Sequence, residues 1–184
     1  MSAALTPMSD PFTVELHAFG LGLMLYSPVV EALLEEGHDY MPADENLAVP
    51  LQTLVDRDQR VVLLGTGSPQ LDYVVHVWRG APPVDLVERA ASHVRFGLDV
   101  AGGELRLRDG YDPMEWRTEG DSVRRVPMPD GYYAVDGLWV PDDQDAMIVH
   151  LFFLRTEERL AGTGWPFLEY VVLDRASRPR NGDT

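Results

Sequence analysis

Apolar and polar residues alternate most clearly between Asp72 and Phe153. Within this stretch, residues 93–100 read His-Val-Arg-Phe-Gly-Leu-Asp-Val, and residues 104–108 read Glu-Leu-Arg-Leu-Arg. A period of two is typical of a strand with one buried face. Gly102 and Gly103 separate the two runs, and glycine accepts the positive φ angles that tight hairpin turns need. The pattern therefore predicts a β-hairpin at 94–108.

Other strands are predicted where short apolar or alternating runs are bounded by turn residues. These runs are 12–26, 60–65, 72–79, 123–126, 132–140, 147–155 and 168–173. Residues 38–59 are interpreted mainly as a connection, with a weak edge strand within 47–55. The long loop at 109–122 is of a length that is usually functional or mobile in a compact domain.

Two short helices are predicted between these strands. The first spans 28–36, because Ser27 suits a helix N-cap and Pro28 suits the first helical position. The second spans 84–92, where Asp85 and Glu88 have the spacing of a capping box. Many short strands with few helices predict an all-β fold, an antiparallel β-sandwich of jelly-roll-like type with one or two short helices.

The length of 184 residues is that of one domain. We expect a flexible N-terminus at 1–11, a single β-sandwich domain at 12–173 and a disordered, arginine-containing tail at 174–184. The chain has no cysteine, which excludes disulfides, thiolate metal sites and cysteine nucleophiles. The sequence shows neither a signal peptide pattern nor an apolar run of about 20 residues, so a cytoplasmic protein is expected.

The charge is strongly negative, with 30 acidic against 15 basic residues. Acids are dense before Arg57 and again in the turn Pro141–Asp145. Such surfaces repel nucleic acid and anionic membranes, and they attract basic partners or cations. The composition therefore argues against a nucleic-acid or membrane partner and favours a basic protein partner, although solubility alone is the plainer explanation of the charge.

Part of the chain resembles the competence protein J family. The likeness covers residues 72–155 and rests on two strand-and-turn patterns. The first is carried by His93, Val94, Leu98, Val100, Gly103, Leu105 and Leu107, and the second by Val126, Met128, Pro129, Gly131, Tyr132 or Tyr133, and Val135. The best-known member of that family inhibits a competence nuclease, so the resemblance implies an inhibitor-like β domain. The chain departs from the family in its N-terminal extension, its enlarged 109–122 loop and its arginine-containing tail.

The candidate partner-binding residues are aromatic side chains of the long loop and acids of two connections. Tyrosine and tryptophan dominate binding hot spots, although they are also ordinary core residues. The predicted contact residues are Tyr111, Trp116, Glu35, Glu36, Asp142, Asp143 and Asp145. No catalytic set is recognised and no cofactor is predicted.

Three histidines provide an alternative. His17, His76 and His150 each fall within a predicted strand, and on one sheet face they would suit Zn²⁺ or Fe²⁺ with Glu15 or Asp72 as a carboxylate ligand. The spacing does not match the familiar metal barrels, and the apolar neighbours of His76 and His150 are more typical of hydrogen-bonded core histidines. Three function classes therefore stay open: an acidic, non-enzymatic inhibitor or immunity-type module that masks a basic nuclease or toxin, a metal-dependent β-barrel enzyme, and a structural subunit of an oligomer. The oligomeric state is not predicted.

Overall fold

The computed structural model describes residues 10–19, 22–41, 49–66, 71–118, 122–141, 147–161 and 166–168. Nearly all of the predicted terminal segments 1–11 and 174–184 lies outside these ranges, so both stay predictions, as does the single domain at 12–173. The described residues form nine strands in two sheets, with two short α-helices and two 3₁₀ helices. None of these helices is long and apolar enough to cross a membrane.

The larger sheet has five strands in the order β1-β4-β9-β8-β5. Its strands are β1 (Phe12–Ala18), β4 (Leu71–Arg79), β9 (Met147–Arg155), β8 (Gly131–Trp139) and β5 (Ser92–Val100). The smaller sheet has four strands in the order β3-β2-β6-β7. Its strands are β3 (Val61–Gly65), β2 (Gly22–Tyr26), β6 (Glu104–Asp109) and β7 (Arg124–Pro127). Neither sheet closes into a barrel within the described part of the chain.

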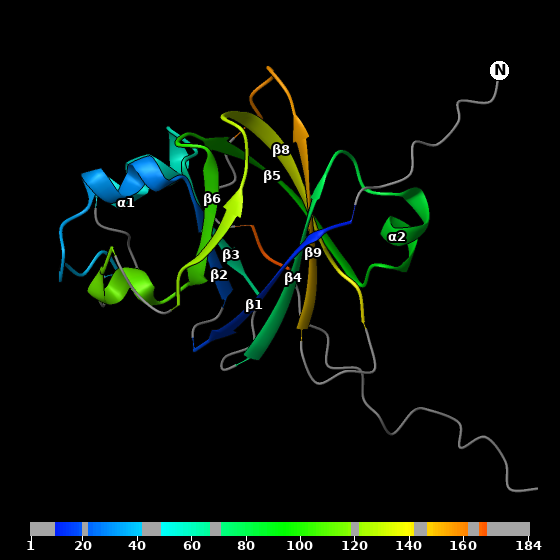
Figure 1. Cartoon of the computed structure of the whole chain (residues 1–184), viewed down its shortest axis with the longest axis horizontal. Helices are drawn as coiled ribbons and strands as arrows, with labels where there is room; N and C mark the ends of the chain where they lie inside the picture. Colours follow the sequence, from blue (N-terminus) through cyan, green and yellow to red (C-terminus); the bar gives the residue numbers. More distant parts are fainter. Residues whose placement is uncertain are drawn as a thin grey trace, which may run out of the picture.

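The two sheets share one apolar core. Both sheets contribute to a single buried cluster, with Leu16 and Val75 from the larger sheet and Leu25 and Leu107 from the smaller. A second cluster covers the outer face of the smaller sheet, where α1 (Val49–Asp56) packs on β2 and β3. Figure 1 shows α1 beyond the smaller sheet and α2 (Val84–Arg89) beyond the larger one. The mostly β class with few short helices is confirmed, whereas a sandwich or jelly-roll arrangement in particular stays a prediction.

The predicted hairpin at 94–108 is wrong, although both of its strands exist. β5 pairs with β8 in the larger sheet, and β6 pairs with β2 and β7 in the smaller one. Gly102 and Gly103 do adopt positive φ angles of 100° and 78°, but their turn carries the chain from one sheet to the other. Asp130 Oδ1 accepts hydrogen bonds from both glycine amides, at 2.9 and 2.7 Å. The alternation identified the buried face correctly, but it carries no information about the partner strand.

The predicted strand at 12–26 is likewise two strands in different sheets. β1 pairs with β4, whereas β2 pairs with β3 and β6. The backbones of β2 and β3 approach closely at Gly22, where a Cβ atom would lie only 2.1 Å from the carbonyl oxygen of Leu64. One strand pair is also not antiparallel, because β4 and β9 run parallel.

Two predictions for connecting segments also need correction. Residues 49–56 form helix α1, because Leu51, Leu54 and Val55 have helical spacing and all three are buried against β2 and β3. The helix expected at 28–36 is the shorter 3₁₀ helix η1 (Pro28–Leu33), without a side-chain cap from Ser27. The Ser27 hydroxyl instead donates to the carbonyl of Ala101 and accepts from its amide, so it ties η1 to the crossover between the sheets.

Candidate functional site

Two segments that are far apart in the sequence lie side by side over the outer face of the smaller sheet. Residues 34–41 follow η1, and residues 111–118 contain the 3₁₀ helix η2 (Asp112–Glu115). Their backbones are joined by three hydrogen bonds, from the amide of Gly37 to the carbonyl of Trp116 at 2.8 Å, from the amide of Trp116 to the carbonyl of His38 at 3.0 Å, and from the amide of Tyr40 to the carbonyl of Pro113 at 2.8 Å. We call these two segments together the acidic ridge.

Arg108 of β6 connects the ridge to the sheet, and its side chain is only 2% exposed. Its Nε donates to Asp112 Oδ2 at 2.5 Å, and its guanidinium nitrogen donates to the carbonyl of Arg117 at 2.8 Å. The guanidinium also lies over the Trp116 ring, with its central carbon 4.6 Å from the ring centroid. A buried arginine that spans η2 in this way makes the loop a defined part of the fold.

The outer surface of the ridge carries acids and two exposed apolar side chains. The ridge contains five acidic residues and one basic residue, Arg117. The acidic residues are Glu35, Glu36, Asp39, Asp112 and Glu115. Glu115 pairs with Arg117, and Asp112 with Arg108. Glu35, Glu36 and Asp39 make no ion pair within the described part of the chain and are exposed.

Glu36 is held in its ionised form by the neighbouring segment. Its Oε1 accepts a hydrogen bond from the Thr118 amide at 2.7 Å, and hydrogen bonding from Thr118 lowers the pKa of the carboxyl below its usual range. On the same ridge, Tyr111 and Met114 are 41% and 48% exposed. The ridge therefore presents permanent negative charge next to apolar surface.

The predicted contact residues fare differently. The structure brings Glu35 and Glu36 together with the loop that carries Tyr111, although the two segments are about 75 residues apart in the sequence. Trp116, in contrast, is fully buried in the second core cluster, edge-on to Tyr26, so it is not available as a surface contact. Asp142, Asp143 and Asp145 lie outside the described residues.

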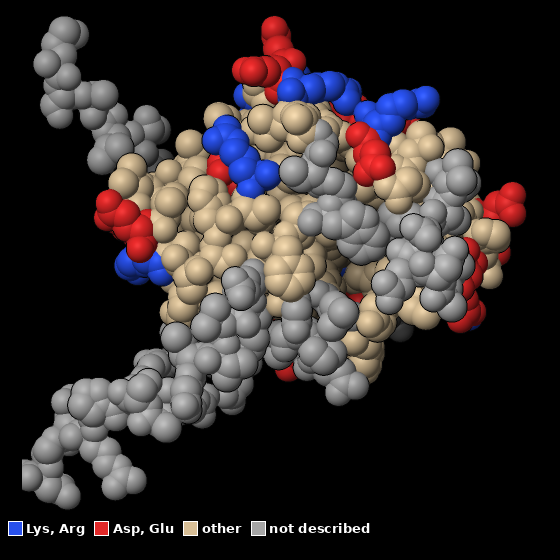
Figure 2. All heavy atoms as spheres, turned by 180° about the vertical axis from the view of Figure 1, so that it is seen from behind, with Lys and Arg blue, Asp and Glu red and all other residues tan. Residues whose placement is uncertain are grey.

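Net charge alone does not locate this surface. On the face shown in Figure 2, charged side chains of the described residues lie mostly toward the edges, and the middle is largely uncharged. Sequence reasoning also missed Asp39 and Met114, because a single aspartate or methionine in a connection carries no pattern. Only the hydrogen bonds between the two segments reveal that these residues share a surface.

The three histidines of the alternative do lie on the outer face of the larger sheet. His76 and His150 are cross-strand neighbours, with ring centroids 5.1 Å apart. His17 instead hydrogen-bonds to Asp72, with its Nδ1 atom 2.6 Å from Asp72 Oδ1. Asp72 is four residues from His76 along β4, and four residues of a strand span about 13 Å. The described residues contain no group of three or more His, Asp or Glu side chains that could hold a metal ion. The three histidines share the sheet face on which the metal-site alternative depended, but the register separates His17 from the other two.

The His76–His150 pair predicts a pH-dependent stability. Burial, together with the nearby His76 and Arg89, lowers the pKa of His150 from 6.5 to about 4. Between these two pH values His150 is protonated in the unfolded chain but not in the folded chain. The free energy of unfolding therefore falls as the pH drops from 6.5 toward 4. After allowance for solvent screening, we expect a loss on the order of 1–2 kcal/mol in the free energy of unfolding.

Urea unfolding at a series of pH values between 7.5 and 4.5 checks this. His150→Leu should flatten the dependence in this range, while replacement of the exposed His38 by glutamine should leave it as steep as in the parent chain. An equally steep fall in His150→Leu would show that other groups are responsible.

Comparison with known proteins supports the fold. No family model and no curated protein matches this sequence. Among solved structures, the chain is similar to ComJ from Bacillus subtilis, an inhibitor of the DNA-degrading activity of NucA, with a TM-score of 0.51 and 9% identity over 82% of this chain and 100% of that one. A second structure, described as crocagin biosynthetic gene J, gives a TM-score of 0.49 and 14% identity over 80% of this chain and 98% of that one.

The chain therefore has a ComJ-like fold. The resemblance inferred from residues 72–155 is confirmed at this level, and the structural likeness extends over most of the chain. At 9% identity the likeness concerns the fold alone.

Proposed function

We propose that this protein is a non-enzymatic binding module that masks a basic partner, in the manner of a nuclease inhibitor or an immunity protein. The observation that carries the proposal is the acidic ridge, whose two hydrogen-bonded segments carry the exposed carboxylates of Glu35, Glu36 and Asp39 and the exposed side chains of Tyr111 and Met114. The ComJ-like fold supports the same class, because ComJ inhibits the DNA-degrading activity of NucA.

The mechanism follows from the composition of the ridge. Its negative charge attracts a cationic surface over about one Debye length, which is about 10 Å at 0.1 M salt, and so accelerates encounter. Apolar contacts through Tyr111 and Met114 then slow dissociation, since aromatic and methionine side chains are enriched where binding energy is concentrated. The acid turn with Asp142, Asp143 and Asp145 belongs to the same proposal as a second source of steering charge.

The test is inhibition of DNA degradation by a purified basic nuclease. NucA and the basic nuclease encoded nearest to the gene for this chain are suitable targets, with plasmid cleavage as the readout. We expect near-stoichiometric inhibition at 50 mM salt and a roughly tenfold or greater loss of potency at 300 mM, because steering is screened.

Two controls make the result specific. An acidic nuclease should be unaffected, and the chain itself should not retard plasmid DNA in a gel, since a net charge of −15 repels phosphate. The proposal would be wrong if inhibition did not depend on salt concentration, or if none of the basic nucleases tested were inhibited.

A further inference from the structure

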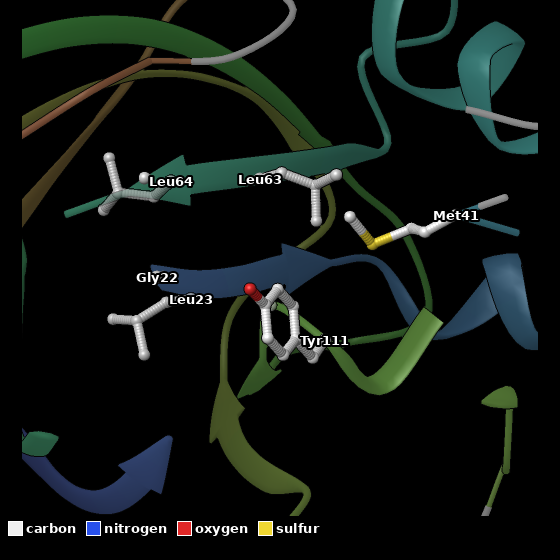
Figure 3. A pocket seen from close by; sticks show the side chains of 8 residues that line it. Gly22, Leu23, Met41, Leu63, Leu64 and Tyr111 are labelled. Atoms are coloured by element: carbon white, nitrogen blue, oxygen red, sulfur yellow. The ribbon is translucent and has the colours of Figure 1, made fainter. Parts of the chain in front are cut away.

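A small apolar pocket lies at the end of the smaller sheet, directly beside the acidic ridge. Its volume is about 110 Å³. It is lined by Gly22, Leu23, Met41, Leu63, Leu64, Gly65, Gly110 and Tyr111. Figure 3 shows the side chains of Leu63 and Met41 close to one another and that of Tyr111 by strand β2, which pairs with β3. None of the described residues that line it is charged, so this lining favours an apolar occupant.

Three of the lining residues, Gly22, Gly65 and Gly110, are glycines, so no side chain from these positions fills the pocket. The close approach of β2 and β3 requires Gly22, as described above, and the amide of Gly110 donates to the carbonyl of Gly22 at 3.0 Å. At Gly65, a Cβ atom would lie 2.6 Å from the Phe167 ring. The backbones are therefore packed tightly around the pocket, and it is part of the folded framework rather than a gap between loose side chains.

Three exposed aromatic residues lie near this end of the smaller sheet, and one of them, Tyr111, lines the pocket. Phe19, Phe167 and Tyr111 are 63%, 55% and 41% exposed. The carboxylate of Asp109 holds two of them in place, since it accepts hydrogen bonds from the amides of Phe19 at 2.6 Å and Tyr111 at 2.9 Å. Single exposed apolar residues are ordinary, but an exposed tyrosine in the lining of an apolar pocket, with two more exposed aromatic residues at the same end of the sheet, is typical of an interaction site.

The pocket and the ridge form one continuous surface. Met41 ends the first segment of the ridge and Tyr111 begins the second, and both line the pocket. Asp39 adjoins this end of the ridge, since its Oδ1 accepts a hydrogen bond from the Met41 amide at 2.8 Å, and Glu35 and Glu36 lie farther along the same ridge. A partner that fills the pocket can therefore extend its flanking residues along exposed carboxylates, whose charge is complementary to lysine or arginine.

The volume decides what kind of group fits. Small-molecule sites usually measure about 300–1,000 Å³, so this pocket is too small for a whole ligand of that kind. An apolar cavity of about 150 Å³ holds benzene, so a slightly smaller pocket suits one aliphatic side chain. We propose that the pocket receives a single leucine- or methionine-sized side chain from a docking segment of the partner, flanked by basic residues that pair with the ridge. This inference rests on the proposed function and adds the recognition chemistry of the partner.

The test uses three capped tripeptides as probes, Ac-Arg-Leu-Arg-NH₂, Ac-Gly-Leu-Gly-NH₂ and Ac-Arg-Gly-Arg-NH₂. Methyl NMR spectra of the full chain report on Leu23, Met41 and Leu63 directly. Both leucine peptides should shift these methyl signals, and the arginine-flanked one should bind roughly tenfold more tightly at low salt, as two exposed ion pairs allow. Equal shifts with Ac-Arg-Gly-Arg-NH₂ would overturn the inference, because charge alone would then explain binding.

Met41→Trp fills the pocket from its half-buried rim, and we expect it to weaken binding of Ac-Arg-Leu-Arg-NH₂ at least tenfold. Val84→Trp is the matched control, because Val84 is 74% exposed on α2, away from the pocket lining. Melting curves establish that each variant is folded, and Tyr111→Ser replaces Met41→Trp if the latter does not fold. Unchanged binding in the folded pocket variant would also overturn the inference.

The two hypotheses fail in different ways. If none of the peptides shifts the three methyl groups at millimolar concentration, while nuclease inhibition remains salt-sensitive, the pocket inference is wrong and the proposed function stands. If the leucine peptides bind in the pocket but no basic nuclease is inhibited, the proposed function is wrong and the pocket remains a docking site for an apolar side chain.

Discussion

Replacing both Glu35 and Glu36 with arginine is expected to slow association with a basic nuclease by about 10- to 100-fold at 50 mM salt, with a much smaller effect at 300 mM. The two side chains are exposed on the ridge, and the change turns two negative charges into two positive ones at the centre of the proposed contact. Stopped-flow or surface-based kinetics at several salt concentrations measure the association rate directly.

The matched control changes the same net charge elsewhere. Asp85 and Glu88 are exposed acids on α2, beyond the opposite sheet, and arginine at both positions alters the total charge equally. This control should slow association only a few-fold, because screening limits the reach of distant charges. Equal slowing in both variants would show that net charge, not the ridge, governs encounter. With glutamine at both positions 35 and 36, the association rate should lie between those of the parent chain and the arginine variant.

Trp116→Ala is expected to lower the free energy of unfolding by about 3–5 kcal/mol, as is usual when a fully buried aromatic side chain is truncated. The Trp116 ring is 0% exposed and packs against Tyr26, with centroids 5.8 Å apart. Its removal also uncovers the guanidinium of Arg108, which holds η2 in place. Urea denaturation followed by circular dichroism measures the loss.

Trp116→Phe separates packing from binding. The indole Nε1 of Trp116 has no hydrogen-bond partner among the described residues, so phenylalanine breaks no hydrogen bond and should cost less than alanine. The phenylalanine variant should stay folded and associate with the nuclease at the parental rate. A folded Trp116→Phe protein that binds more than tenfold more weakly would instead make Trp116 a contact residue.

The candidate site was only partly predictable. Sequence reasoning selected Glu35 and Glu36 as acids of one connection, and Tyr111 and Trp116 as aromatics of another. It had no means to tell that Trp116 turns inward while Tyr111 stays exposed, because both types are common in cores and in interfaces. The pocket could not be predicted either, since its lining comes from two strands and two connections that meet only in the folded chain.

By itself, the sequence determined which residues face the core. The alternation at Phe96, Leu98 and Val100 predicted buried positions that the structure contains, because side chains on a strand point to opposite faces with a strict period of two. Only the tertiary structure decided the strand partners, the crossing of the chain at Gly102 and the meeting of the two ridge segments. The hydrophobic effect has no direction, so a pattern of burial fits many pairings, and long-range hydrogen bonds and close packing select one of them.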